Sequence, residues 1–324
     1  MQLLAAHKEL FLKYLKKNLT KKQPENLYNP AKYILELGGK RIRPLLTLLS
    51  AEVFDTKPTY ALNGALAIEI FHNFSLVHDD IMDKAPIRRG RQTVHKKWNT
   101  NTAILSGDAM LIWSYQLLEK YPSEVSLSLI KLFSSSAIKV CEGQQLDMDF
   151  SLKENITIID YLKMIENKTS VLLGCALAIG AIISKVSQKD VDKLYKLGID
   201  IGYIYQLQDD FLDAFGDSKQ TGKQEGGDII ENKKTFLYIH AKENCSVTEN
   251  ETLKELFKTH PKNPSEKIKI VKAIFLSSGA DKAIKNKINY YRKSALNKIN
   301  KLSINKEKKS LFYSLINNLI NRSF

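Results

Sequence analysis

The chain has 324 residues, of which 44% are hydrophobic and 26% charged, and its formal net charge is +14. This length and apolar content suit one large all-helical domain with a sizeable core. The positive charge is compatible with nucleic acid, anionic membrane or phosphorylated ligands. However, the lysines are scattered and no basic stripe is interleaved with aromatic residues, which argues against nucleic acid as a partner.

Nothing in the sequence predicts secretion or a transmembrane segment. Lys8 and Glu9 interrupt the N-terminal apolar stretch too early for a signal peptide. The longest apolar run, Val171–Ile183, is shorter than the ~20 residues that a membrane span needs. Cys141, Cys175 and Cys245 lack paired spacing, as expected for reduced thiols in a cytoplasmic protein.

Helical spacing of apolar residues dominates from end to end, and the prolines fall near predicted helix starts or in loops. No low-complexity linker or change in composition divides the chain, so we expect a single all-α domain over residues 1–324. In chain order, the expected helices are Leu3–Leu19, Pro30–Leu37, Ile42–Phe54, Thr59–Lys84, Thr100–Lys120, Glu124–Met148, Ile156–Lys185, Gln188–Phe215, Asp228–Asn244, Glu249–Thr259, Ser265–Ser278, Ala280–Ile299 and Lys306–Asn321.

Two of these helices end in the same acidic pattern. The helix Thr59–Lys84 is apolar on most sides, as in the centre of a bundle, yet ends in DDIMD. The helix Gln188–Phe215 ends in DDFLD. In each cluster the first and third acids are four residues apart and share one helix face, where like charges destabilise the helix unless a cation is present. The acids are Asp79, Asp80 and Asp83 in the first cluster, and Asp209, Asp210 and Asp213 in the second.

Carboxylates without His or Cys at metal spacing suit a hard cation, above all Mg²⁺ completed by substrate phosphates. Two solvated acidic turns are the plain alternative, which the repeated spacing disfavours. His78 next to Asp79 and Asp80 also permits a His-Asp metal-dependent phosphohydrolase, but that reading leaves the second cluster unexplained.

Basic residues accompany both clusters. The segment GGKRIRP opens a helix, where glycines allow close backbone approach and the helix N-terminus favours anions. Together with the acids, these cations fit two diphosphates, one bridged by metal and one held by Lys and Arg alone. The basic candidates are Lys40, Arg43, Arg88, Arg89, Lys168 (followed by Thr169), Lys223 and Lys233.

The ordered motifs GGKRIRP, EIFHNFSLVHDDIMD, RRG, GQQLD, KTS, YQLQDDFLDAFGD and GKQEGGD resemble the trans-polyprenyl diphosphate synthases. The resemblance covers about residues 38 to 234. It implies an all-α bundle around a deep central cavity, a homodimer, and Mg²⁺-dependent head-to-tail condensation of isopentenyl diphosphate with an allylic diphosphate. It also implies three Mg²⁺ ions when diphosphate is bound.

The resemblance assigns a role to each candidate. Both aspartate clusters bind metal, with Asp79, Asp83 and Asp209 on the ions that bridge the allylic diphosphate. That diphosphate contacts Arg88, Lys168 and Lys223. Isopentenyl diphosphate is held by Lys40, Arg43, His72 and Arg89. Gln206 and Thr169 lie near the reacting carbons, Gln144 and Asp147 form a supporting shell, and Lys233 is a more distant basic residue.

Product length is expected to depend on side chains one turn before Asp79, where the growing tail would run. Phe74 and Ser75 are five and four residues upstream, and Phe71 is deeper. An aromatic residue five positions upstream resembles geranylgeranyl or farnesyl synthases, so we predict a twenty-carbon product, with fifteen carbons or a longer chain as alternatives. The alternative is that Phe74 is an ordinary core residue with no role in product length.

Two further functions share parts of the pattern. A class I terpene cyclase has the same bundle but usually one such acidic cluster and none of Lys40, Arg43 and His72. A non-catalytic subunit of a heteromeric synthase typically loses acids, whereas this chain has all six.

Overall fold

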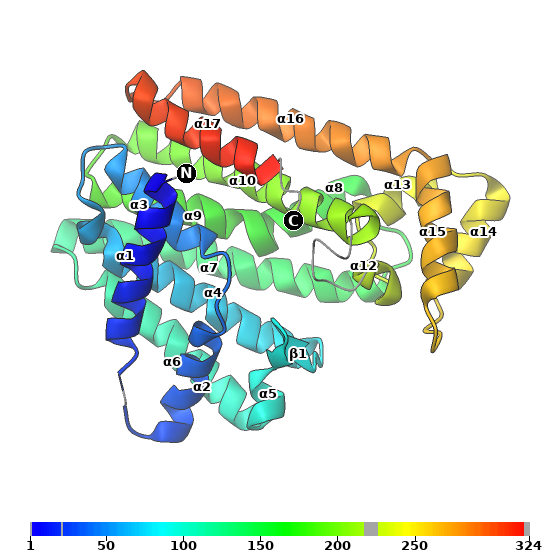
Figure 1. Ribbon diagram of the computed structural model, residues 1–324, viewed down its shortest axis with the longest axis horizontal. Coiled ribbons are helices and arrows are strands. Elements are labelled where there is room, and N and C mark those ends of the chain that lie inside the picture. The colour runs from blue at the N-terminus through cyan, green and yellow to red at the C-terminus, as the bar shows by residue number, and fades with distance from the viewer. Residues whose placement is uncertain (1, 21, 217–225, 321–324) are drawn as a thin grey trace. The chain divides into compact units, whose positions relative to one another are not determined.

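The computed structural model describes residues 2–20, 22–216 and 226–320, and its elements are labelled in Figure 1. Helices account for almost all of the regular structure, which confirms the all-α class. The chain divides into two compact units, residues 1–138 with 172–198, and residues 139–171 with 199–324. Helices α7, α9 and α10 contribute residues to both units, and the single domain expected from the sequence stays a prediction.

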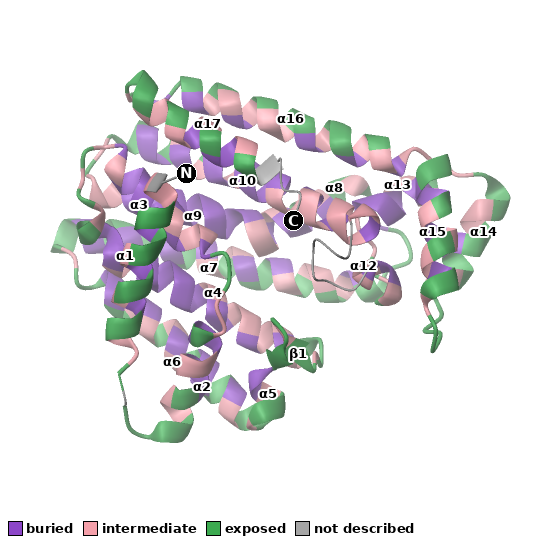
Figure 2. Cartoon of the chain, in the orientation of Figure 1, coloured by how far each residue is buried: buried purple, intermediate pink, exposed green. Residues whose placement is uncertain are grey.

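The first unit is built around helix α4, which packs against α1, α2, α3, α5 and α6. Helix α4 is buried on most sides because its apolar residues surround it, among them Leu66, Ile68 and Ile70, all fully buried. Figure 2 shows α9 coloured almost wholly as buried. The elements are α1 (Gln2–Asn18), α2 (Glu25–Glu36), α3 (Ile42–Glu52), the 3₁₀ turn η1 (Pro58–Ala61), α4 (Leu62–Met82), β1 (Ile87–Arg88), β2 (Arg91–Gln92), α5 (Val94–Lys97), α6 (Thr100–Leu118), and parts of α7 (Ser123–Leu152), α9 (Val171–Ile183) and α10 (Gln188–Phe215).

In the second unit, helix α13 packs against α8, α14, α15 and α16. Capping boxes start two of its helices: the side chains of Thr157 and Asp160 cap α8, and those of Ser246 and Glu249 cap α14. Besides the remainder of α7 and α10, the elements are α8 (Ile158–Ile165), the π-helical turn η2 (Glu166–Ser170), α12 (Gly227–Ile230), α13 (Phe236–Asn244), α14 (Val247–Leu256), α15 (Ser265–Ser277), α16 (Ala280–Asn300) and α17 (Lys306–Ile320).

Three sequence predictions of element type were wrong. The helix expected over Ile156–Lys185 is interrupted by η2, and the one expected over Asp228–Asn244 is broken at residues 231–235. No strand was expected, yet β1 and β2 form a hairpin with Ile87 opposite Gln92. Its turn residues Arg89 and Gly90 both have positive φ, at 51° and 73°, which is the conformation of a two-residue type I′ turn.

The stretch Ile158–Ile183 is long and apolar enough to cross a membrane by length and composition, and 78% of its most apolar window is buried inside the protein. Buried core helices pass the same test, so the stretch is weak evidence for a membrane span.

Candidate active site

The first acidic cluster lies at the C-terminal end of α4. Asp79 and Asp80 belong to its last turn, and Asp83 is the C-cap residue. Because the C-terminal end of a helix carries partial negative charge, carboxylates there are destabilising without nearby cations. The Asp79 carboxylate is partly exposed and Asp83 is exposed, whereas Asp80 is 1% exposed.

The hairpin after α4 supplies a cation to this cluster. Arg88 of β1 donates through Nε to both carboxylate oxygens of Asp80, at 2.8 and 2.9 Å, and its Nη2 is 3.6 Å from Asp79 Oδ2. Burial raises the pKa of Asp80, although the Arg88 guanidinium opposes the shift. Asp80 therefore fixes Arg88 in place, while Asp79 and Asp83 present the more accessible oxygens.

Beside the same hairpin, several cations surround one histidine. Arg89 donates a hydrogen bond to the carbonyl oxygen of Gly38. Gly39 has a φ of +123°, which L side chains rarely adopt, and a Cβ there would also lie 3.0 Å from the Arg89 guanidinium carbon. The pKa of His72 is held well below its ordinary value, first by burial and then by four positive charges. These belong to Arg43, Arg89, Arg88 and Arg41.

This arrangement leaves His72 neutral in a strongly positive environment. Among the residues predicted to bind isopentenyl diphosphate, Arg43 and Arg89 are close enough to His72 for their charges to lower its pKa. Lys40 is exposed in the loop before α3. A neutral imidazole among arginines can still donate one hydrogen bond to an anion.

Arg41 has a structural role in this region that we did not predict from the sequence. Its φ is 53°, and its buried guanidinium donates to the carboxylate of Glu69 and to the carbonyl oxygen of Leu35. Glu69 is itself 2% exposed and accepts a further bond from Asn73 at 3.1 Å. The only sequence signal was an acid inside an apolar helix, which needs a buried partner.

His72 is expected to make the protein less stable in acid. In the unfolded chain its pKa is near 6.5 and it takes up a proton below that pH, whereas the folded His72 resists protonation. The contribution of neutral His72 to the free energy of unfolding is thus fully present above pH 6.5. It is lost as the pH falls towards the pKa of His72 in the folded protein.

The effect can reach at most about 2 kcal/mol at pH 5, because each pH unit below 6.5 contributes about 1.4 kcal/mol. Chemical denaturation of the wild type and of His72→Asn at pH 7.5 and 5 measures it. The wild type should lose more stability than His72→Asn on acidification. Equal losses of stability in the two proteins would show that burial and the neighbouring arginines do not lower the pKa of His72.

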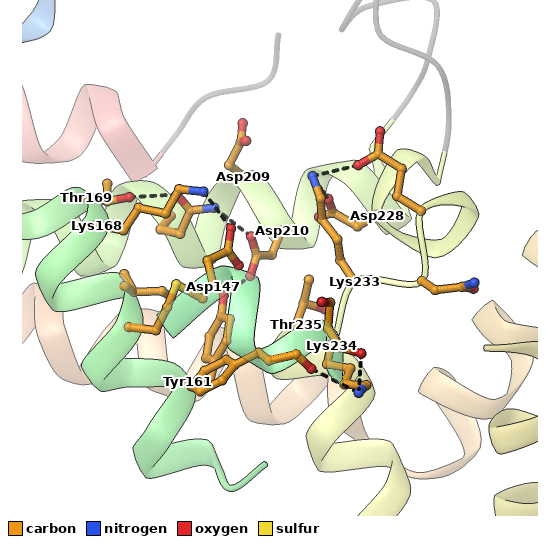
Figure 3. A pocket seen from close by; sticks show the side chains of 17 residues that line it. Asp147, Tyr161, Lys168, Thr169, Asp209, Asp210, Asp228, Lys233, Lys234 and Thr235 are labelled. Atoms are coloured by element: carbon orange, nitrogen blue, oxygen red, sulfur yellow. Dashed lines mark hydrogen bonds and ion pairs between the residues drawn. The ribbon is translucent and has the colours of Figure 1, made fainter. Parts of the chain in front are cut away.

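The second acidic cluster lies at the end of α10 and borders a cavity of about 240 Å³ within the second unit. Figure 3 shows the side chains that line it. Asp209 and Asp210 are among them, together with other residues of α10 and with residues from α7, α8, η2, α12 and the segment after α12. These include Asp147, Tyr161, Lys168, Thr169, Gln206, Asp228, Lys233 and Lys234.

Asp210 is buried in a hydrogen-bonded chain. Tyr161 of α8 donates its hydroxyl to Asp210, and Gln206 donates from Nε2 to the other carboxylate oxygen at 2.9 Å. Thr169 in turn donates to Gln206 Oε1 at 3.3 Å. Burial raises the pKa of Asp210 well above its ordinary value, with the charge of Asp228 as the next cause. Gln206 and Thr169, two predicted catalytic residues, are therefore oriented by this acid.

The π-helical turn η2 presents Lys168 to the cavity. A π-turn inserts one residue into a helix, and such turns are frequent at functional sites. It fits because two glycines approach it: a Cβ on Gly143 would lie 2.2 Å from the Lys168 nitrogen, and a Cβ on Gly202 would lie 2.4 Å from the Ser170 Cα. Lys168 Nζ then reaches Asp147 Oδ2 at 2.6 Å, as Figure 3 shows.

The segment Gly226–Lys233 packs around the third acid of the cluster. The backbone nitrogen of Asp228 donates to Asp213 Oδ2 at 2.9 Å. Burial raises the pKa of Asp228 to about 6, and the charge of Asp213 adds to the shift. Lys233 Nζ is 3.5 Å from Asp228 and 2.8 Å from Glu231. The acids of this pocket repel one another, so a divalent cation would relieve them.

Lys223 lies outside the described residues. Among the described residues, no set of three or more His, Cys, Asp or Glu side chains could hold a metal ion by itself. The acids of both clusters supply oxygen ligands only, and such a site suits Mg²⁺ that takes its other ligands from substrate phosphates and water.

The comparisons with known proteins agree with this chemistry. The Polyprenyl synthetase family model matches residues 24–274. A geranylgeranyl diphosphate synthase of Methanosarcina mazei is 40% identical over 221 residues, 68% of each protein. A geranylfarnesyl diphosphate synthase of Natronomonas pharaonis is 37% identical over 258 residues, 74% of this chain and 76% of that protein.

A crystal structure of a geranylgeranyl pyrophosphate synthase is 47% identical and superposes with a TM-score of 0.95 over 99% of both chains. An all-α fold with two aspartate-rich helix ends and cationic side chains beside them defines a prenyltransferase. The chain belongs to the polyprenyl synthetase family. The resemblance drawn from the sequence motifs is therefore confirmed.

Proposed function

We propose that this prenyltransferase condenses isopentenyl diphosphate head-to-tail with allylic diphosphates and releases all-trans geranylgeranyl diphosphate. The observation that carries the proposal is the repeated acidic cluster at the ends of α4 and α10. Arg88 contacts Asp80 of the first cluster, and Lys168, paired with Asp147, lines the same cavity as Asp209 and Asp210 of the second. A class I cyclase has no use for the second anion site around Arg43, His72 and Arg89.

Mg²⁺ fits both clusters because every ligand they offer is a carboxylate oxygen and because the acids in each crowd one another at a helix end. We assign Asp79 and Asp83, with Asp80 behind them, and Asp209 and Asp213, with Asp210 behind them, to three ions in the presence of diphosphate. Bound Mg²⁺ supplies positive charge that stabilises the departing diphosphate.

The protein's own groups complete that stabilisation. Arg88 and Lys168 are preorganised by Asp80 and Asp147, so they can meet the charge that develops on the leaving diphosphate without rearranging. Lys223 is assigned the same role. Gln206 and Thr169 are assigned to orient the reacting carbons, and Lys233 is the outer cation. Isopentenyl diphosphate is assigned to Lys40, Arg43, His72 and Arg89.

The proton lost after condensation goes to the departing diphosphate. The guanidinium and ammonium groups beside the substrates cannot accept it because they have no acceptor, and His72, whose pKa is held low by burial and by four arginines, is a weak base. Apolar helix walls protect the allylic cation from water.

A direct assay tests the proposed function. Purified protein, isopentenyl diphosphate, farnesyl diphosphate and Mg²⁺ should yield a twenty-carbon diphosphate, and EDTA should stop its formation. In a second assay, geranyl diphosphate replaces farnesyl diphosphate as the allylic substrate. Farnesyl diphosphate as its end product would favour the fifteen-carbon alternative. Cyclic terpenes without elongation would replace the proposal with a cyclase.

Product length is assigned to the aromatic residues of α4. Phe74 is buried beside Phe71 and His78, with ring centroids 5.4 and 4.8 Å away. Phe71 in turn contacts Phe133 edge-on at 5.1 Å. Ser75, one turn before Asp79, donates to the carbonyl oxygen of His72 and adds little bulk.

Replacing Phe74 by leucine or alanine is expected to lengthen the product beyond twenty carbons, because the smaller side chain opens the path of the tail. Chromatography of dephosphorylated products measures the change. Leu76→Ala is the matched control, since Leu76 is partly buried on the same helix but two residues from Phe74 and so on the opposite face of α4. Twenty-carbon products from both Phe74 variants would show that Phe74 does not limit the length of the growing prenyl chain.

We propose a cytoplasmic homodimer. The apolar side chains of Leu105 and Ile112, 60% and 59% exposed, lie seven residues apart on one face of α6, as expected of a helix that is covered by a second copy. The three cysteines are unbridged, as in a reducing compartment. Sedimentation velocity of the purified protein tests the dimer.

A further inference from the structure

A second cavity of about 690 Å³ lies in the same unit as the aspartate-rich pocket of α10. It is bordered by the end of α7 and by α13 and α14. Four lysines line it, against two carboxylates, Glu154 and Glu231. Glu231 is engaged by Lys233 at 2.8 Å. The lysines are Lys234, Lys242, Lys254 and Lys258.

Ion pairs among the described residues do not neutralise the positive charge of this cavity. Within the described part of the chain, no carboxylate lies within 4.0 Å of the four lysine amines. Lys234 donates to the carbonyl oxygens of Phe150, Ser151 and Lys153. Figure 3 shows Lys234 making such contacts. Lys242 donates to the Glu154 carbonyl and the Asn155 side chain at 2.8 and 2.9 Å.

Neutral acceptors hold Lys234 and Lys242 in place, and the charge of Glu154 offsets only part of the positive charge at Lys234. The pKa of Lys234 is lowered by burial and by the neighbouring charge of Lys242, so the two amines repel each other. Lys254 of α14 and Lys258 in the turn after that helix are both exposed, and both border the cavity. Amines fixed on one wall and adaptable lysines on another are suited to an anion with several oxygens.

We propose that this second cavity binds a diphosphate group, separately from the aspartate-rich pocket. The walls also offer an apolar surface, because Tyr238 and Phe257 pack with ring centroids 4.2 Å apart and border the cavity together with Leu152. The ligand is therefore either inorganic diphosphate or the head of a prenyl diphosphate whose chain covers these rings.

The two cavities share a wall. Ser151, Glu231, Asn232 and Lys234 border both of them. Lys234 directly follows Lys233, which contacts Asp228 in the aspartate-rich pocket. A ligand in the second cavity therefore meets the segment that carries a cation of the first. The identity of the ligand rests on the proposed function, since condensation releases diphosphate, but its binding can be measured without turnover.

The test compares two charge-matched variants of the full chain. Lys254→Gln/Lys258→Gln removes two cations of the second cavity, and Lys282→Gln/Lys293→Gln removes two exposed cations of α16, whose side chains do not border it. Isothermal titration with inorganic diphosphate forms one arm. Titration with a non-ionisable prenyl thiolodiphosphate, after the aspartate-rich pocket has been saturated, forms the other. Initial condensation rates without added diphosphate should match the wild type for both variants, which checks folding.

We expect one fewer diphosphate bound per chain in Lys254→Gln/Lys258→Gln than in the control pair, or roughly tenfold or more weaker binding of that one equivalent. Weaker binding of inorganic diphosphate by Lys254→Gln/Lys258→Gln would show that diphosphate alone is sufficient for binding to the second cavity. Weaker binding of the prenyl thiolodiphosphate alone would show that the prenyl chain is also needed. Equal stoichiometry and affinity in both variants, in both arms, would overturn the second site.

Discussion

Asp209→Asn is expected to lower the turnover number by about 10³-fold, the cost of removing one preorganised group that stabilises transition-state charge. Asparagine keeps the shape and one oxygen but loses the negative charge that attracts a divalent cation. Because Asp209 is partly exposed beside the buried Asp210, its replacement should leave the fold intact. Steady-state kinetics at saturating Mg²⁺ and circular dichroism measure the two expectations.

Asp192→Asn is the matched control, since Asp192 is exposed near the start of the same helix and accepts a hydrogen bond from Gln188 Nε2 at 2.8 Å. It should retain turnover within about twofold, as surface substitutions usually do. Asp79→Asn, in the other cluster, should lose about as much as Asp209→Asn. Turnover within tenfold of the wild type for either Asp209→Asn or Asp79→Asn would show that its cluster does not serve the reaction.

Lys168→Met should lower the turnover number by about 10²- to 10³-fold, because it removes a fixed positive charge from the leaving diphosphate. Methionine keeps the length of the side chain and its packing in η2. Asp147→Asn should cost less, because the lysine keeps its charge and loses only the partner at 2.6 Å that positions it. A double-mutant cycle should show that the two losses are not additive.

Lys163→Met provides the comparison for loss of a lysine in the neighbouring turn. Lys163 is 56% exposed and pairs with Glu166 at 3.4 Å on the surface, an interaction worth little. It should keep normal turnover. Normal turnover in Lys168→Met as well would mean that η2 has a structural role and that the charge comes from elsewhere.

The two acidic clusters could be placed from the sequence because each ends a long predicted helix, and the predicted bounds Thr59–Lys84 and Gln188–Phe215 lie close to those of α4 and α10. The capping residues of α8 and α14 follow the usual side-chain pattern. Such local rules are readable in one sequence because each depends on residues at most four positions apart.

The elements that the sequence missed depend on distant partners. The π-turn η2 follows ordinary helical composition, and it is accommodated by Gly143 and Gly202, which are far from it in the chain. The hairpin turn at Arg89-Gly90 lacks the Asn-Gly or Asp-Gly pair typical of type I′ turns. Tyr161 could not be linked to Asp210 because they are 49 residues apart.

The central proposal is that the acids of both clusters are needed for Mg²⁺ binding in the presence of an allylic diphosphate. Equilibrium dialysis of Mg²⁺ with and without a non-ionisable allylic thiolodiphosphate tests it most directly. We predict weak Mg²⁺ binding to the protein alone, three ions per chain with the analogue, and fewer in both Asp79→Asn and Asp209→Asn. Three ions retained in either variant, or equal Mg²⁺ binding with and without the analogue, would contradict the claim.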